Sequence, residues 1–328
     1  AWKGVLPAGD AGGGAPSAAA LDLVSIKTPL LRLFDRDFTQ VDTVLRPRQG
    51  GWQISVNMHE AAGDVFWHSA GDGSLDGRLQ RLVVLPAITT VKRDIDLINA
   101  LPAMNLVVDD FTVGERRLGR LEVKARHEKG AWRMETLSLA NPDGNLNPKA
   151  LWRHTPRHQS RLDFELTASD VGKLLDRLGY GEVVRRGTAT LTGDLQWDGP
   201  LTAIDYASLT GNLMVEARKG QFSKLDPGVG KLLGLLSLQS LPRRLTLDFG
   251  DIFSEGLAFD TIDGKMDVKS GIMRTSGPLR IASPAAQIEI QGETDLKRET
   301  QDLRVMVRPF VGASRRPPAR QPWSIPCS

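Results

Sequence analysis

Residues 226–263, DPGVGKLLGLLSLQSLPRRLTLDFGDIFSEGLAFDTID, contain the change of periodicity that decides the fold. The segment opens with Asp226 before a proline, a combination typical of a helix N-terminus. Leucines then cover most of the circumference of a short helix through residue 241, and Pro242 ends it. Apolar and polar residues alternate in the next stretch, in which the apolar ones are Leu245, Leu247 and Phe249. This pattern predicts a short apolar helix that packs as a cap or gate against a strand with one apolar side.

Segments outside this stretch also favour strands. Short alternating runs, separated by Gly, Pro, Asp or Asn, recur from Leu21 to Pro309. Residues 86–103 interrupt them, and we expect a short helix or an ordered connection there. A second helix is predicted between Ser169, as its N-cap, and Gly179. The predicted fold is mainly β: an elongated, curved antiparallel sheet that forms an open hydrophobic groove, with two or three short helices.

A degenerate repeat supports an elongated architecture. Residues 51–67 read as a hairpin that has Trp52 near its start and Trp67 at its end. Residues 131–152 repeat this arrangement with another pair of tryptophans, and a looser third copy ends at Trp197. A repeated unit that cannot bury its own apolar face is typical of stacked, extended proteins.

Composition excludes several classes of function. The chain has 328 residues with 42 basic and 39 acidic side chains, and three of the basic ones lie in the last eighteen residues. This balance argues against a nucleic-acid partner, which needs an excess of positive charge. The single cysteine, Cys327, allows no internal disulfide. We expect a flexible linker at 1–20, one β region at 21–310 with a subdivision near 86–103, and a disordered Pro/Arg-rich tail at 311–328.

No motif for catalysis or metal binding stands out, so we expect no enzyme activity, no catalytic residue, no metal and no cofactor. His154 and His158 have a spacing that could chelate a metal on a helix, but Pro156 separates them and no acidic or cysteine partner is near. Asp109 and Asp110 accompany no nucleophile motif, and outward-facing strand positions explain them better. The same holds for a scattered acidic series: Asp248, Asp251, Asp260 and Asp263.

Four segments resemble the AsmA-like superfamily, and within it the YhdP type. They are LPAMNLVVDDFTVGERRLGRLEVKA (101–125), GYGEVVRRGTATLTGDLQWDGP (179–200), LLGLLSLQSLPRRLTLDFGDIFSEGLAFD (232–260) and GPLRIASPAAQIEIQGETDL (277–296). The resemblance extends over about 21–309. It implies a periplasmic β-groove protein tethered to the inner membrane by an anchor upstream of this chain, which we expect to be a fragment. It also implies phospholipid as the cargo and outer-membrane components as further partners.

Residue patterns and resemblance together predict a segment of a lipid conduit that spans the periplasm. An unclosed sheet with one apolar face would shelter acyl chains from water. The predicted wall residues are Leu245, Leu247, Phe249, Leu257, Phe259, Ile288, Ile290, Val305 and Val307. Arg243 and Arg244 are candidate contacts for a lipid phosphate, or else they complement the dipole of the preceding helix. The alternatives are a scaffolding β-protein of the cell envelope without a groove and, more remotely, a glycan-acting β-solenoid enzyme.

Overall fold

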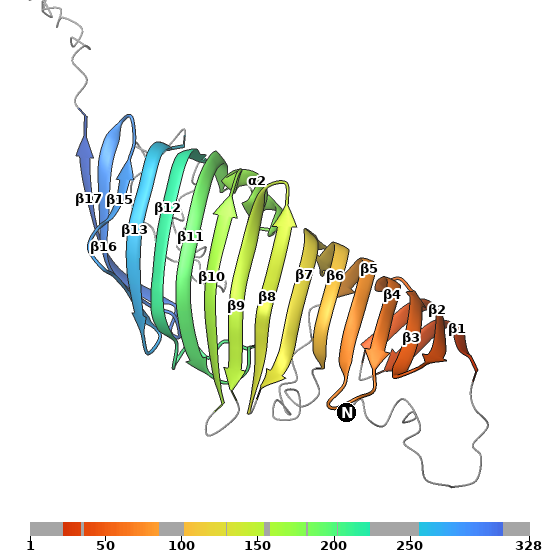
Figure 1. Cartoon of the computed structure of the whole chain (residues 1–328). Helices are drawn as coiled ribbons and strands as arrows, with labels where there is room; N and C mark the ends of the chain where they lie inside the picture. The colour runs from red at the N-terminus through yellow and green to blue at the C-terminus, as the bar shows by residue number, and fades with distance from the viewer. Residues whose placement is uncertain are drawn as a thin grey trace, which may run out of the picture.

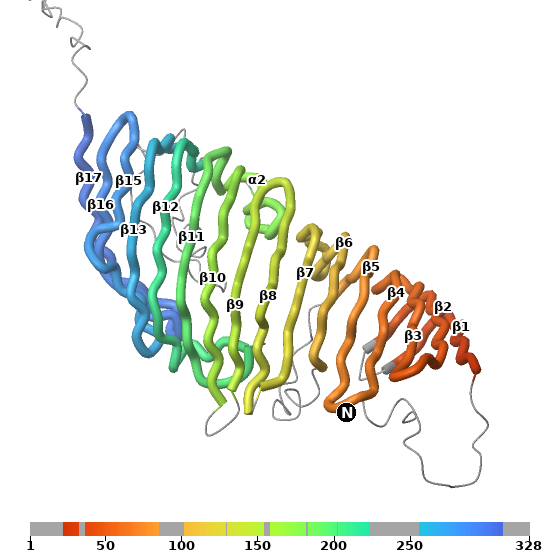
Figure 2. Tube along the Cα trace, viewed as in Figure 1, coloured from red at the N-terminus to blue at the C-terminus, as the bar shows by residue number. Residues whose placement is uncertain are grey.

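The computed structural model describes residues 22–33, 36–84, 102–128, 130–153, 158–181, 183–201, 203–223 and 256–310. These residues form one sheet of seventeen strands and one short helix, α2. The strands stand side by side in a long, curved and twisted array that runs from β1 to β17 (Figures 1 and 2). The prediction of a mainly β protein built on an elongated, curved sheet is confirmed.

The strands follow the chain in order. The first nine are β1 Val24–Leu33, β2 Arg36–Arg48, β3 Gly51–Asn57, β4 Ala61–His68, β5 Ser74–Val84, β6 Ala103–Val113, β7 Arg116–Glu128, β8 Ala131–Asn141 and β9 Gly144–Arg153. The rest are β10 Gln159–Ala168, β11 Val184–Asp198, β12 Thr210–Phe222, β13 Ala258–Lys269, β14 Ile272–Thr275, β15 Leu279–Ala282, β16 Ala286–Asp295 and β17 Thr300–Pro309.

Each strand pairs with the next one along the chain, and β14 and β15 share the place between β13 and β16. The pairs are antiparallel except that β5 and β6 run parallel. The expectation of an antiparallel sheet is therefore wrong at this one place. Residues 85–101 join the end of β5 to the start of β6, and these two points lie at opposite sides of the sheet. The helix predicted at 86–103 lies outside the described residues, apart from its last positions.

This order gives the sheet two long rims. The tryptophan rim is where β3, β6, β8, β10 and β12 begin and where β4, β7, β9 and β11 end. The helix rim is the opposite one, where the turns 58–60, 114–115 and 142–143 and the helix α2 lie. Substantial contacts between strands occur only between sheet neighbours in the described part of the chain, so the sheet does not fold back on itself.

Helix α2, Val171–Arg177, is fixed to the helix rim by polar contacts. Its N-cap is Asp170, whose carboxylate accepts a hydrogen bond from the backbone N–H of Lys173. The predicted cap, Ser169, is wrong by one residue, because its hydroxyl donates instead to the carbonyl oxygen of Pro142. Leu174 and Leu175 are buried against the sheet.

Arg177 ties the last turn of α2 to the turn between β8 and β9 and to β7. Its guanidinium contacts the Asp143 carboxylate at 2.5 Å and donates to the carbonyl oxygen of Arg117 at 3.0 Å. The helix predicted at 226–241 lies outside the described residues. No helix among those that are described is long and apolar enough to cross a membrane.

Candidate functional site: the apolar inner face of the sheet

One face of the sheet, which we call the inner face, carries an apolar row that crosses thirteen strands. Residues paired across neighbouring strands project on the same side of a sheet. The paired positions from β1 to β13 are Ile26, Thr43, Val56, Gly63, Leu79, Val108, Leu121, Leu139, Leu146, Leu166, Leu191, Val215 and Gly264. Thr43 is the one residue of this row with a polar side chain.

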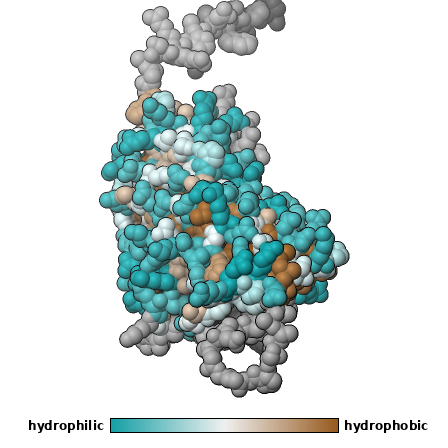
Figure 3. Space-filling model, turned by 45° about the vertical axis from the view of Figure 1, so that its right-hand side comes forward, coloured by the Kyte–Doolittle hydropathy of each residue, from teal (hydrophilic) through white to brown (hydrophobic). Residues whose placement is uncertain are grey.

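The row continues past the strand that ends this list. A Cβ atom on Gly264 would lie 2.9 Å from Cγ of Leu279, so the Leu279 side chain occupies the space above the glycine. Leu279 pairs with Ile290, and Ile290 pairs with Val305 on the last strand. The apolar surface is therefore continuous from β1 to β17. In Figure 3, apolar residues form patches among polar ones, in the middle of the molecule and toward its right-hand side.

Six of the nine predicted wall residues lie in one cluster on this face. Leu257, Phe259 and Ile288 are buried, and three others pack against the same cluster: Ile290, Val305 and Val307. The cluster also contains Leu175 of α2 and Phe222, whose ring centroid lies 5.1 Å from that of Phe259. Leu245, Leu247, Phe249, Arg243 and Arg244 lie outside the described residues.

Gly220 makes room for the ring of Phe259. A Cβ atom there would lie only 2.4 Å from the Phe259 ring, so the ring rests directly on the backbone of β12. Any side chain at this position would push the phenyl group off the sheet. The burial of Phe259 therefore depends on a residue one strand away.

The tryptophan rim ends the inner face in a regular way. Every tryptophan in the described part of the chain lies one residue from the end of its strand at this rim: Trp52, Trp67, Trp132, Trp152 and Trp197. The first two form a cross-strand pair, and so do the next two. All five are between 1% and 8% exposed. The hairpin repeat read from the sequence thus corresponds to a line of buried indoles.

Ser160 completes this line. It pairs with Trp152 on one side and with Trp197 on the other, and it is 0% exposed. Its hydroxyl donates to the carbonyl oxygen of Gly199 at 2.8 Å. Because Ser160 is small and its hydroxyl has a backbone acceptor, the indoles of Trp152 and Trp197 can lie in one row on either side of it.

The outer face is polar and held by ion pairs. The Arg78 guanidinium binds the Asp109 carboxylate with both of its hydrogen bonds, and Arg120 binds the same group at 3.0 Å. The hydrogen bond from Arg78 holds the pKa of Asp109 below its usual value. Asp110 pairs with Arg117 at 2.7 Å. These two acids lie on a strand, as predicted, and each has a structural partner.

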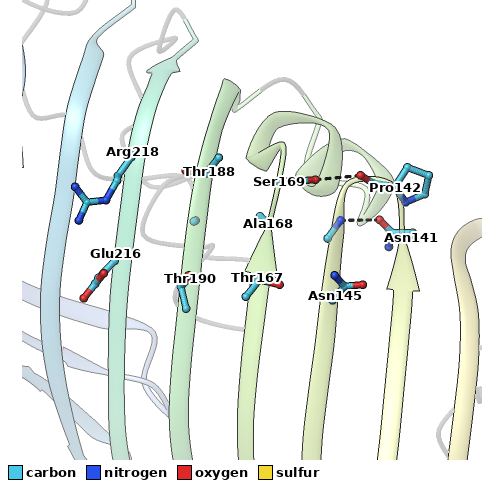
Figure 4. A pocket seen from close by; sticks show the side chains of 12 residues that line it. Asn141, Pro142, Asn145, Thr167, Ala168, Ser169, Thr188, Thr190, Glu216 and Arg218 are labelled. Atoms are coloured by element: carbon cyan, nitrogen blue, oxygen red, sulfur yellow. Dashed lines mark hydrogen bonds between the residues drawn. The ribbon is translucent and has the colours of Figure 1, made fainter.

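A shallow pocket of about 300 Å³ lies on the same polar side. Thr167, Thr188, Thr190, Glu216 and Arg218 project into view from three neighbouring strands there (Figure 4). It lacks the apolar lining and convergent polar groups of a small-molecule site. We assign it no function.

The described residues bring together no group of three potential metal ligands. His154 is outside them, and His158 follows that gap before β10. The residues that sequence reasoning missed are those of the apolar row between β1 and β12. Their alternation is visible in the sequence, but the pairing that aligns Leu79 with Val108 or Leu166 with Leu191 is not.

Two comparisons with known proteins found a match. The family model described as "YhdP protein" matches residues 1–315. A curated relative, the "Intermembrane phospholipid transporter YhdP" of Escherichia coli (strain K12), is 28% identical over 187 residues. That match covers 55% of this chain but 15% of the relative, so the chain corresponds to a small part of that protein's length. No solved structure matches the chain.

Proposed function

This chain belongs to the YhdP protein family, and on that premise we propose that its inner face holds the acyl chains of phospholipids moving between the inner and outer membranes. The observation that carries the proposal is the apolar row. Its thirteen side-by-side positions, at about 4.8 Å per strand, extend for roughly 58 Å. One leaflet of a bilayer has a hydrocarbon thickness of about 15 Å, so the row could accommodate several lipids in succession.

Energetics favour such a surface as a path. Exposing an acyl chain to water costs about 0.8 kcal/mol per methylene. A lipid with two long chains therefore faces a desorption barrier of tens of kcal/mol, which a continuous apolar surface lowers. No bond is made or broken in this process, so the proposed role requires no catalytic residue and no cofactor.

The cellular setting of the proposal follows the relative's printed name. An intermembrane transporter of phospholipid operates in the periplasm of a cell with two membranes. We therefore place this chain there, as one segment of a longer conduit that is tethered to the inner membrane. Outer-membrane components are the partners we expect at its far end.

Leu191→Asp tests the proposal. Leu191 is half-buried and lies within the row, on β11, so a carboxylate there is tolerated by the fold but would have to lose water when a lipid covers it. That desolvation costs several kcal/mol. Thr188→Asp is the matched control, because Thr188 is exposed on the same strand and pairs with Arg218 on the outer face.

The readout is phospholipid that copurifies with the full-length protein, together with photo-crosslinking to lipid from Ile290, which is only half-buried on the inner face. We expect Leu191→Asp to lose most of the bound lipid and Thr188→Asp to keep it. Equal lipid binding by both variants, or no lipid adduct from any inner-face position, would favour the scaffold alternative instead.

A further inference from the structure

The two rims of the sheet differ, and the difference bears on how a lipid lies between them. This inference rests on the proposed function. Strand β11 has fifteen residues and is therefore about 50 Å long. A phospholipid can thus lie along a strand, with its headgroup toward one rim and its chain ends toward the other.

The tryptophan rim is closed by the protein's own loops. The indole N–H of Trp197 donates to the carbonyl oxygens of Pro200 and Ala203 at 2.9 and 3.1 Å, and that of Trp132 to Pro102 at 3.4 Å. Apolar side chains of the loop after β11 pack against the same rim: Leu201, Ile204 and Tyr206. A rim finished in this way offers an apolar, water-excluded end suited to acyl chain termini.

The helix rim exposes more large apolar groups to water than the tryptophan rim, where Leu23, before β1, is 49% exposed. Leu30, Tyr180 and Phe310 are 51%, 43% and 60% exposed, and all three lie at this rim. Aromatic and aliphatic groups at a boundary between apolar surface and water are typical of the interfacial level of a lipid. A lipid glycerol region would therefore fit here better than at the tryptophan rim.

Two cations lie close to each other in register on neighbouring strands at the helix rim. Arg186 on β11 pairs with Gly220 on β12, and Lys219 precedes that glycine, so the two basic residues are offset by one residue. Each has a left-handed backbone, with φ of 57° and 54°, and each precedes a glycine. Both are exposed, and within the described residues neither makes an ion pair, although exposed Asp260 lies on the next strand.

Apolar surface borders this pair directly. Gly220 carries the ring of Phe259, and Val184 pairs with Phe222 two residues before Arg186. An arginine fork and a lysine point charge beside an apolar cluster match the phosphate and acyl parts of one phospholipid.

We propose that a phospholipid on the inner face lies with its acyl chain ends toward the tryptophan rim and its phosphate at the helix rim, bound by Arg186 and Lys219. Two photoreactive phosphatidylethanolamines test the orientation, one with the reactive group on the headgroup and the other with it at the acyl terminus. The headgroup probe should label peptides that contain 180–186 and 219–222. The acyl probe should label 195–209. The opposite pattern, or equal labelling of both rims, overturns the proposal.

Charge reversal tests the two cations. The double variant Arg186→Glu/Lys219→Glu should retain about three- to tenfold less phosphatidylglycerol from vesicles, the range expected for partly exposed charge contacts. Lys269→Glu/Lys297→Glu is the matched control, because these exposed lysines lie at the tryptophan rim. An equal loss in the control overturns the assignment.

Inorganic phosphate separates the two possible phosphate sources. If it displaces lipid from the wild type only weakly, the pair recognises a headgroup that is anchored by its chains. If it binds the pair as tightly as lipid does, the site is for free phosphate and the proposal fails. Loss of lipid in Leu191→Asp with no effect of the double variant would leave the proposed function intact and refute this inference alone.

Discussion

Trp152 and Trp197 offer a sharp comparison, because they occupy equivalent places and differ in one hydrogen bond. Both are almost fully buried, at 1% and 2% exposed. The N–H of Trp197 has two carbonyl acceptors, whereas that of Trp152 is buried without an acceptor in the described structure. Replacing each indole by a phenyl ring removes the same atoms from the same kind of environment. The two substitutions should nevertheless differ in cost.

The magnitudes follow from this difference. Trading Trp for Phe loses roughly 40 Å² of buried apolar surface, about 1 kcal/mol, and leaves a small cavity that costs about another 1 kcal/mol. Trp152→Phe also removes an unsatisfied donor, which returns about 1–3 kcal/mol. Its net effect should lie between about −1 and +1 kcal/mol. Trp197→Phe instead leaves the carbonyls of Pro200 and Ala203 without their donor, so its cost should be about 3–5 kcal/mol.

Urea unfolding followed by far-UV circular dichroism measures the comparison, since tryptophan fluorescence changes with the substitution itself. We expect the midpoint of Trp197→Phe to fall clearly below that of Trp152→Phe, with unchanged slopes. If Trp152→Phe were as destabilising as Trp197→Phe, the indole of Trp152 would have an acceptor, and the explanation would be wrong. Trp152→Ala should cost about 3–5 kcal/mol in either case and confirms that the site is buried.

Two further predictions concern the fold around the inner face. Burial pushes the pKa of Glu60 up, but hydrogen bonds from the backbone N–H and hydroxyl of Thr39 outweigh it and hold the pKa below its usual value. Glu60→Gln should therefore lower the free energy of unfolding above about pH 4.5. The difference in this free energy between wild type and variant should shrink as the pH falls through the lowered pKa of Glu60. If the difference stayed constant in unfolding curves measured down to about pH 3, the prediction would be contradicted. Gly220→Val should displace the Phe259 ring and cost about 1–3 kcal/mol. Phe259→Ala in the same chain should recover part of that cost in a double-mutant cycle, and strict additivity of the two would argue against the contact.

The sequence predicts the strand content well because the alternation of apolar and polar residues within each strand shows which side of it is apolar. Alternation in 286–295 and 300–309 is enough to place Ile288 and Val305 on one face, and the pairing of β16 with β17 brings them together. The tryptophan repeat likewise predicts a repeated hairpin, because a bulky residue near a strand end is a local feature. These inferences succeed where the information lies within about ten residues.

Long-range features are harder to read. The parallel pairing of β5 with β6 depends on where the chain returns after residue 84, which no local pattern specifies. The N-cap of α2 lies one residue later than predicted. Both Ser169 and Asp170 can cap a helix, but the turn at Pro142 supplies an acceptor for the serine hydroxyl. The row from Ile26 to Gly264 needs twelve registers at once, and a one-residue slip in any of them would reverse a strand's faces.

The inner face requires a second layer, which the described residues supply only in part. A sheet with one apolar face is stable in water when something covers that face. Among the described elements, α2 alone lies on it, and it reaches the sheet near one rim through Leu174 and Leu175. Many residues of the row, such as Leu166 and Leu191, remain half-buried although their strands are fully paired. The acyl chains of the proposed lipid cargo are a cover of the right chemistry for such a surface, because they are apolar along their length.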